Sequence, residues 1–213
     1  MEVRKLEDKD IPAICKQIST RLIDAVEASY QLDGISDRRR LTDVFTQSRM
    51  KYWLRIGEVW VIGDNEGMLA GHYRSNENVI AAILPSLTLI RNVRKLLSKE
   101  DRVRLDINLK NSVGAENFTW RKQVFKKQDY YYIEMIAINR ELKGRGAFRR
   151  LIEPVITRAQ HENMPVLLDT HDKDNVPIYQ HFGFEVVHEH RSKRNPDLVQ
   201  YSMVKHPDVR REE

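Results

Sequence analysis

The residues that could do chemistry gather in the second half of the chain, and the first of them form a Gly-x-Gly turn, Gly144-Arg145-Gly146. The turn stands between a predicted strand and a predicted helix, so its free backbone N–H groups face the space beyond the helix N-terminus. That position favours an anion by about 0.3–1 kcal/mol per exposed group, and glycines allow phosphate oxygens to come close. Lys143 and Arg145 add positive charge there. Turns of this composition are common, but this one predicts a phosphate-binding loop.

Two familiar nucleotide-binding patterns are absent from this loop. Arg149 stands where Gly-x-Gly-x-x-Gly would place its third glycine, which disfavours a dinucleotide-binding fold. The loop also lacks the Gly-Lys-Ser/Thr ending of a nucleoside-triphosphate loop. The phosphate, if one is bound, therefore belongs to another kind of ligand.

The elements that hold the turn form a strand–helix–strand unit. Residues 130–138 are aromatic and β-branched, which is typical of a strand buried on both faces. Residues 148–159 carry an apolar stripe at helical spacing, and Pro154 is expected to bend that helix. Residues 166–168 form the next strand. Such a unit makes the two strands parallel, with a right-handed crossover.

Hydrophobic periodicity and turn residues predict the other elements. In the first half we expect a short strand near Val3, a helix that begins at Asp10 and buries Cys15, a helix over 38–56 and two strands within 59–73. We expect helix over 80–110 and a loop over 111–128. The last part should hold a short helix over 175–181 and strands over 183–187 and 198–204.

Composition places the chain among globular proteins. It has 213 residues, 41% apolar and 31% charged, and one cysteine, which excludes a disulfide scaffold. No apolar run reaches the length of a membrane span, and the N-terminal residues lack the apolar core of a secretion signal. We therefore expect a cytoplasmic protein without membrane contact.

The positive charge is concentrated in one segment, residues 91–127. This segment has eleven Lys/Arg against four Asp/Glu, a balance of 11 − 4 = +7 within a chain of net charge +5. It could attract phosphate groups of a cofactor or a nucleic acid, but a solvated helix face is the more common origin of such a run. Its aromatic residues are bunched at one end, which disfavours stacking on bases. Nucleic acid is therefore an unexpected partner.

Five segments, in this order, resemble the GNAT superfamily of acyl-CoA-dependent N-acyltransferases. They are Tyr132–Ile138, Lys143–Phe148, Leu168–Thr170, Asn175–Tyr179 and Phe182–Phe184. The layout is most similar to bacterial members of the puromycin N-acetyltransferase type. The resemblance is good over 129–187, weaker to Lys205, and only architectural over 1–75.

The resemblance implies one α/β domain over residues 1–213. Its central sheet would be mixed and mostly antiparallel, flanked by helices, with a βαβ cofactor-binding core. Within it we expect N-terminal helices and strands over 1–75, a basic and largely helical insertion over 76–128, and the CoA-binding core with the C-terminal strands over 129–205.

The resemblance also implies acetyl-CoA as co-substrate. The pyrophosphate loop of the family falls on residues 141–146, although Glu141 replaces the usual Gln or Arg and Phe148 replaces a further glycine. The strand before the loop would pair its backbone with the pantetheine arm. The implied cofactor-binding residues are Ile136, Ala137, Ile138, Lys143, Gly144, Arg145, Gly146, Ala147, Phe148 and Asn175; Asn175 could cap the short helix as well.

The implied reaction is the attack of a neutral amine on a thioester. Deprotonating an alkyl ammonium of pKa near 10.4 at neutral pH costs about 4.6 kcal/mol, so a base is useful, and the leaving thiolate benefits from an acid. Tyr179 matches the general acid of the family. Glu134 is the candidate base, expected on the same strand face as Ile136 and Ile138, with a structural, salt-bridged acid as the alternative. Residues 130–132 would line the acceptor cleft or pack as core.

Other reactive residue types are given no catalytic role. Cys15 belongs to a core-facing stripe, so we expect direct attack in a ternary complex and no acyl-enzyme. His188 and His190 have metal-ligand spacing on one strand face, but no third ligand lies nearby, and we expect no metal.

The sequence as a whole predicts an N-acetyltransferase that acetylates the primary amine of an unidentified small molecule. Residues 30–56 and 72–128 should build the acceptor side of the cleft. Two alternatives stay open, a peptide or protein amine acetyltransferase and a non-catalytic acyl-CoA-binding regulatory module. The sequence also leaves open whether the chain forms a homodimer.

Overall fold

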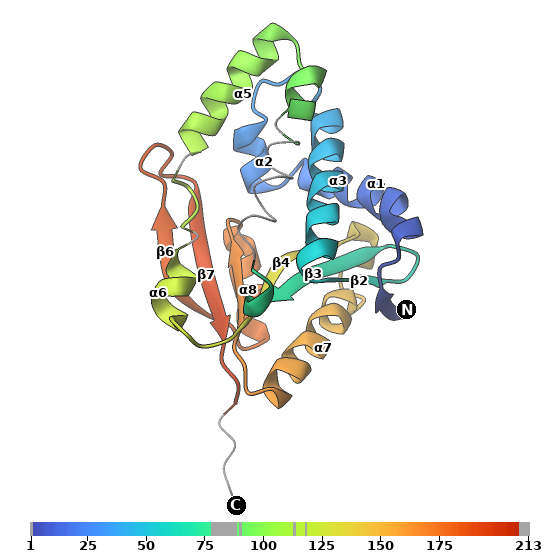
Figure 1. Cartoon of the computed structure of the whole chain (residues 1–213), viewed down its shortest axis with the longest axis vertical. Helices are drawn as coiled ribbons and strands as arrows, with labels where there is room; N and C mark the ends of the chain where they lie inside the picture. The colour runs from blue at the N-terminus through green and yellow to red at the C-terminus, as the bar shows by residue number, and fades with distance from the viewer. Residues whose placement is uncertain (1, 78–88, 90, 113, 118, 209–213) are drawn as a thin grey trace, which may run out of the picture.

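The computed structural model describes residues 2–77, 89, 91–112, 114–117 and 119–208, and it contains one sheet of seven strands (Figure 1). The strand order is β1-β2-β3-β4-β5-β7-β6, and every neighbouring pair is antiparallel except β4 and β5. The strands are β1 Val3–Lys5, β2 Glu58–Ile62, β3 Gly67–Tyr73, β4 Tyr131–Ile138, β5 Val166–Thr170, β6 Glu185–Arg191 and β7 Val199–Lys205. The predicted mixed, mostly antiparallel sheet is confirmed.

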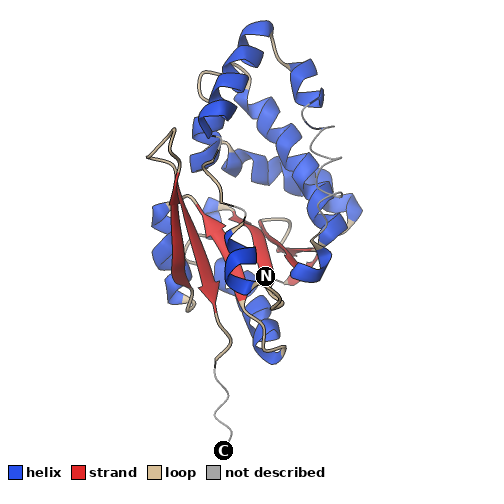
Figure 2. Ribbon diagram, turned by 60° about the vertical axis from the view of Figure 1, so that its left-hand side comes forward, coloured by secondary structure: helices blue, strands red, loops and turns tan. Residues whose placement is uncertain are grey.

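Helices cover both faces of the sheet. They are α1 Ile11–Leu22, α2 Val26–Gln31, α3 Arg38–Ile56, α5 Lys99–Ser112, α6 Trp120–Phe125, α7 Ala147–His161 and α8 Val176–His181. Single 3₁₀ turns occupy Asp8–Asp10, Arg74–Asn76, Arg140–Leu142 and Lys173–Asn175. Helix α7 lies on one face of β2–β4, α1 and α3 lie on the other, and α2 and α5 gather beyond one end of the sheet (Figures 1 and 2). No helix in the described ranges is both long and apolar enough to cross a membrane.

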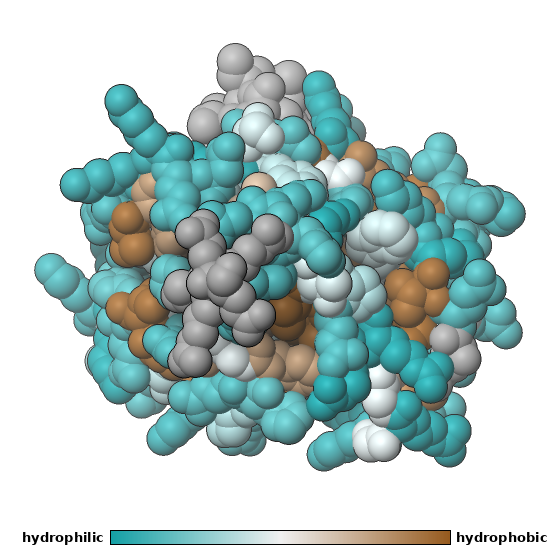
Figure 3. Space-filling view, turned by 90° about the horizontal axis from the view of Figure 1, so that it is seen from below, coloured by the Kyte–Doolittle hydropathy of each residue, from teal (hydrophilic) through white to brown (hydrophobic). Residues whose placement is uncertain are grey.

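Two apolar clusters divide the core between the two faces. The α7 face packs helix residues such as Leu151 against Tyr131 and Ile133 of β4. The other face packs Ile14 of α1 and Trp53 of α3 against β2 and β3. Cys15 belongs to this second cluster at 2% exposure, and burial raises the pKa of its thiol to about 11, as expected of an unreactive core cysteine. The surface in Figure 3, in contrast, is mostly hydrophilic, with apolar side chains in small separate groups.

The predicted elements are confirmed over most of the chain, including the helix over 38–56 and the strand–helix–strand unit with its parallel pair β4–β5. The loop expected over 111–128 is wrong, because α6 forms inside it. Six residues make a helix there because Trp120 and Phe125 are buried against Tyr130 and Leu167. A helix of six residues is not stable by itself in water, so tertiary packing stabilises α6.

The helix expected over 80–110 is interrupted within the described residues. Residues 78–88 and 90 lie outside the described residues. Residues 91–96 are helical, and a new helix, α5, begins at Lys99. Ser98 separates the two, because its Oγ accepts a hydrogen bond from the N–H of Asp101 at 3.0 Å, which is how serine caps a helix start.

Strand β4 has two irregularities that decide where site residues point. Its pairing with β3 shifts by one residue, since Ala70 lies opposite Met135 while Gly71 lies opposite Ile133, so Glu134 is the extra residue of a β-bulge. On its other edge, β4 pairs with β5 only through Tyr131–Ile133. Beyond Ile133 the two parallel strands separate and leave a gap in the sheet.

Candidate active site

The gap between β4 and β5 exposes backbone groups of β4 that have no strand partner. The Asn139 N–H donates to the carbonyl of Glu66 at 2.7 Å, so residue 139 faces β3. Backbone groups in an antiparallel pair alternate in direction, so Ala137 also faces β3, whereas Ile136 and Ile138 direct their N–H and C=O groups into the gap. Two of the three predicted strand residues can therefore offer hydrogen bonds to a ligand lying in the gap. The third, Ala137, lies between them and directs its backbone groups toward β3.

The glycine turn stands where the gap meets the start of α7. Gly144 and Gly146 have φ of +77° and +74°, the left-handed region that glycine adopts without strain. A Cβ added at either position would meet no other protein atom within 4 Å, so the space in front of the turn is open. The buried side chains of Leu142 and Ala147 fix the turn from both sides. Neither glycine N–H bonds to another described residue, which leaves both free for an anion.

The charged side chains of the loop point outward. Glu141, Lys143 and Arg145 are all exposed, so the two cations are free to approach a phosphate group. The N-terminus of α7 adds to the positive charge of these two side chains, because the first N–H groups of a helix carry partial positive charge. The positions predicted to bind an anion thus come together at one site.

Tyr179 lies on α8, on the α7 face of the sheet. It is 9% exposed and packs near the rings of Phe148 and Phe184, with centroid distances of 5.7 and 5.9 Å. Its hydroxyl makes no hydrogen bond to another described residue. Burial raises the pKa of the phenol above its ordinary value of 10, and the charge of Asp172 raises it further. Tyr179 therefore holds its proton and can act as a donor.

Two smaller expectations near Tyr179 receive an answer. Asn175 stands at the N-cap position of α8, but its side chain makes no capping hydrogen bond, so the predicted cap is wrong. The backbone of Asn175 is in a helical conformation, so the preceding 3₁₀ turn continues into α8 without a break. Phe148, in the place of a further glycine, packs on Phe182 and Tyr179 and so joins the loop to α8.

Glu134 does not share a face with Ile136 and Ile138, and this expectation is wrong. The two isoleucines pack toward the α7 cluster, whereas Glu134 lines a cleft on the opposite face. The bulge is the reason, because one extra residue reverses the alternation of side chains along β4. Glu134 and Tyr179 thus lie on opposite faces of the sheet.

The cleft that Glu134 lines has a volume of about 560 Å³ and lies between α1–α3 and the strands. Its apolar wall includes Leu32, Phe45, Trp53 and Met135, and its polar lining includes Arg121, Tyr132, Glu134 and Asp169. Both segments predicted to build the acceptor side contribute to it, through residues from Gln31 to Trp53 and through Leu89, Glu116 and Arg121. Of the three tyrosines over 130–132, Tyr132 lines the cleft, while the other two are core residues at 1% exposure.

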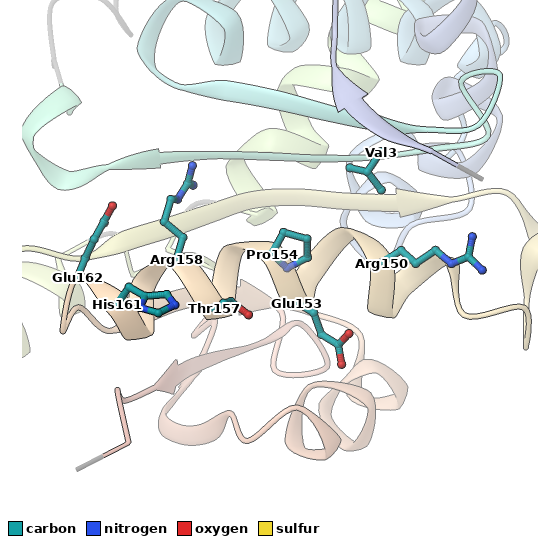
Figure 4. A pocket seen from close by; sticks show the side chains of 8 residues that line it. All are labelled: Val3, Arg150, Glu153, Pro154, Thr157, Arg158, His161 and Glu162. Atoms are coloured by element: carbon teal, nitrogen blue, oxygen red, sulfur yellow. The ribbon is translucent and has the colours of Figure 1, made fainter. Parts of the chain in front are cut away.

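A larger hollow of about 850 Å³ lies along α7, from Arg150 to Glu162, with Val3 of β1 beside it (Figure 4). None of the predicted site residues lines it. The smaller cleft, which reaches β4 and lies beside the gap, is therefore the candidate site.

A polar network beside the cleft was not anticipated from the sequence. Glu77 accepts hydrogen bonds from the Tyr130 hydroxyl at 2.7 Å and from Arg121 at 3.0 Å. Burial raises the pKa of Glu77, but His72, Tyr130 and Arg121 outweigh it and bring the pKa to about 2. Asp169 accepts from the Tyr132 hydroxyl at 2.8 Å, the Ser202 hydroxyl at 2.6 Å and the Trp120 indole at 3.2 Å.

Arg121 does not lie on a solvated helix face, which is the more common origin expected from the sequence for the basic segment over residues 91–127. Its side chain is only 13% exposed, and its guanidinium lies 3.9 Å from the centre of the Tyr132 ring. The aromatic residues of α6 were the signal in the sequence that could have revealed this, because a charged residue next to buried aromatic side chains is itself more often buried than one in a run of solvent-exposed charges. The two histidines of β6 gain no metal partner, and the described ranges hold no group of three or more His, Cys, Asp or Glu that could bind a metal ion.

Comparison with known proteins agrees with this geometry. Residues 123–205 match the acetyltransferase (GNAT) domain family. An uncharacterized N-acetyltransferase of Schizosaccharomyces pombe is 33% identical over 66 residues, which is 30% of this chain and 27% of that protein, so the chain spans about a quarter of that relative.

Solved structures show the same fold over nearly the whole chain. A histone acetyltransferase HPA2-related protein from Corynebacterium glutamicum has a TM-score of 0.61 at 16% identity, covering 97% of this chain and 96% of its own. Arylalkylamine N-acetyltransferase 2 from Aedes aegypti has a TM-score of 0.60 at 12% identity, covering 97% and 99%. The match over residues 123–205 confirms the similarity to the GNAT superfamily of N-acetyltransferases that the motif order predicts, and the solved structures show that nearly the whole chain has the same fold.

Proposed function

We propose that the protein is an acetyl-CoA-dependent N-acetyltransferase that acetylates the primary amine of a small molecule by direct attack in a ternary complex. The opening between β4 and β5 carries this proposal, because it joins an anion-binding turn on one side to a cleft on the other. A ligand lying in the opening would have its phosphates at Gly144–Gly146 and its reactive end beside Glu134.

The residues of the gap fit acetyl-CoA. The co-substrate supplies an activated acetyl thioester. The N–H groups of Gly144 and Gly146, with Lys143 and Arg145, would hold its diphosphate, and the backbone of Ile136 and Ile138 would hydrogen-bond its amide-containing arm as a neighbouring strand would. Ala147, Phe148 and Asn175 would complete the wall of this site.

Glu134 and Tyr179 would divide the proton transfers between the two faces. Glu134 accepts the proton that the amine nitrogen loses as its bond to the acetyl carbon forms. Tyr179 donates its hydroxyl proton to the sulfur as the carbon–sulfur bond breaks, giving the free thiol. The proton held by Glu134 then returns to the tyrosinate through solvent, so each residue ends as it began.

The charges around the cleft favour an amine as acceptor. The cleft is lined by three carboxylates, Glu116, Glu134 and Asp169, and by two guanidinium groups, those of Arg49 and Arg121. Asp169 is held by three neutral donors, so its charge is not cancelled by a direct ion pair within the described residues. A cationic amine is drawn to such a site before it loses its proton.

Substituting Gly144 by leucine is expected to weaken acetyl-CoA binding at least about tenfold, because the side chain fills the open space that the phosphates need. Gly114 offers a matched control, since it also has a positive φ, +80°, and open space around its Cβ. Isothermal titration with acetyl-CoA should show a loss of affinity for Gly144→Leu and none for Gly114→Leu. Equal affinities in the two variants would remove the loop from the cofactor site.

The acceptor class can be found by measuring CoA release with a panel of phenethylamine, tryptamine, spermidine, puromycin and a peptide with a free N-terminus. We expect turnover with one or more of the four small amines. Turnover with the peptide alone would make the protein a peptide amine acetyltransferase. Binding of acetyl-CoA without turnover of any amine would favour the non-catalytic regulatory module.

A further inference from the structure

His72 of β3 is a buried histidine that the reaction just described does not use. It is 2% exposed and lies between two carboxylates. Its Nε2 is 3.7 Å from Oε1 of Glu77, and its Nδ1 is 3.6 Å from Oε1 of Glu134. Nδ1 is buried without a hydrogen-bond partner among the described residues. An orphaned nitrogen of this kind calls for an explanation, because a buried polar atom usually has a partner.

The surroundings of His72 hold the ring in place. The ring packs edge-on against Tyr132, with 5.6 Å between centroids. Gly57 lies close to the start of this side chain, since a Cβ at Gly57 would lie 2.7 Å from the Cβ of His72. The 2% exposure and the contact with Tyr132 therefore hold the ring between the two carboxylates.

Glu77 decides which ring nitrogen carries the hydrogen. Its carboxyl stays ionised, with a pKa of about 2, and it is fixed by Tyr130 and Arg121. A hydrogen bond from His72 is among the interactions that lower the pKa of Glu77, so the hydrogen belongs on Nε2, where it points to Glu77. Nδ1 then presents its lone pair toward Glu134.

We propose that His72 is a positioning residue of the acetyl transfer, whose Nδ1 accepts a hydrogen bond from Glu134 once that carboxylate has taken the proton of the attacking amine. The inference rests on the proposed function. Before the transfer, Glu134 has no hydrogen to donate, which accounts for the orphaned Nδ1. After it, the O–H of Glu134 and the Nδ1 lone pair complement one another.

An interaction that forms only as the proton moves lowers the barrier of the chemical step rather than strengthening substrate binding. The charged and titratable groups around the ring are Glu77, Glu134, Tyr132, Tyr130 and Arg121, and none but Glu134 lies within ion-pair distance of Nδ1 among the described residues. The effect of His72 should therefore pass through Glu134 alone.

Two amide variants separate the two ring nitrogens. In His72→Asn the amide oxygen can take the place of Nδ1 and accept from Glu134, whereas in His72→Gln the longer side chain reaches toward Glu77 instead. With the fastest amine of the panel, we expect kcat of His72→Asn within about threefold of the wild type and kcat of His72→Gln about 10-fold lower, which is near the upper end of what one hydrogen bond between neutral groups contributes. The Kd for acetyl-CoA should stay within twofold in both.

A double-variant cycle supplies the readout that a merely structural role would not give. In a Glu134→Gln background, His72→Gln should lower kcat less than twofold further, because the partner is gone. The exposed His161, changed to Asn, serves as the control for assay and preparation, and thermal unfolding reports the folding of each variant. If His72→Gln does not fold, His72→Asn decides alone, since a loss of kcat above tenfold in a folded His72→Asn overturns the inference.

Equal losses in the two His72 variants, or additive losses with Glu134→Gln, overturn the inference while leaving the proposed function in place. An active wild type is the condition for both results. A wild type that turns over none of the panel amines instead refutes the proposed function, and with it the role of His72.

Discussion

Replacing Tyr179 by phenylalanine is expected to lower kcat about 100-fold and to leave the Kd for acetyl-CoA within about twofold. The variant removes only the hydroxyl, and that hydroxyl makes no hydrogen bond with another described residue, so the fold loses little. The leaving sulfur loses its proton donor, and positioned acids contribute about 10²–10⁴ to rates. Steady-state kinetics with the best panel amine and calorimetric titration with acetyl-CoA measure the two quantities.

Tyr131 provides the matched control for this experiment. It is also a buried tyrosine on the α7 face, but its hydroxyl donates to Glu58 at 3.0 Å, beside Arg158 and away from the gap. Tyr131→Phe should lower the melting temperature and leave kcat unchanged. A loss of kcat and of acetyl-CoA affinity by the same factor in Tyr179→Phe would show that Tyr179 shapes the site rather than donating a proton.

Replacing Glu77 by glutamine is expected to remove a stabilisation of the folded protein that is present at neutral pH and lost at acid pH. The folded protein holds the pKa of Glu77 at about 2, against an ordinary value of 4.5, so the unfolded chain binds more protons between these values. The stabilisation is therefore complete above about pH 4.5 and is lost as the pH falls toward 2. A shift of 4.5 − 2 = 2.5 units corresponds to about 3 kcal/mol at most, on a side chain that is 23% exposed.

Denaturant unfolding of the wild type and Glu77→Gln at pH 7, 4.5 and 3 measures this term. We expect the difference in unfolding free energy to be largest at pH 7 and to shrink by pH 3. Glu153→Gln is the control, because Glu153 forms an exposed ion pair with Arg149 on α7 and should change stability by less than about 0.5 kcal/mol. A difference for Glu77→Gln that does not vary with pH would contradict the assignment.

Sequence reasoning succeeded where one segment carried its own signal. The run over 130–138 is so rich in aromatic and β-branched residues that its strand was evident, and the glycine turn followed by an apolar stripe marked the start of α7. Their order, together with the segment around Tyr179, carried the resemblance to the GNAT superfamily, which the family match over residues 123–205 supports. The short helix α6 was missed because its six residues have no such pattern and are held by the burial of Trp120 and Phe125.

The face of Glu134 could not be predicted because the bulge depends on β3 as well as on β4. Gly71 lies against the Tyr131 ring, and a Cβ there would come within 2.5 Å of it, so the local register rests on a contact between distant parts of the chain. The network of His72, Glu77 and Arg121 has the same origin. Its members come from β3, the segment after it and α6, and only the folded chain brings them together.

The bulge at residue 134 gives the two sides of this sheet separate evolutionary freedom. Side chains around Glu134 that line the cleft can change while the neighbouring isoleucines keep their contacts with α7 and their open backbone groups. Under the proposed function, new acceptors would be acquired by substitutions on one side of the sheet, while the residues proposed to hold acetyl-CoA stay unchanged on the other.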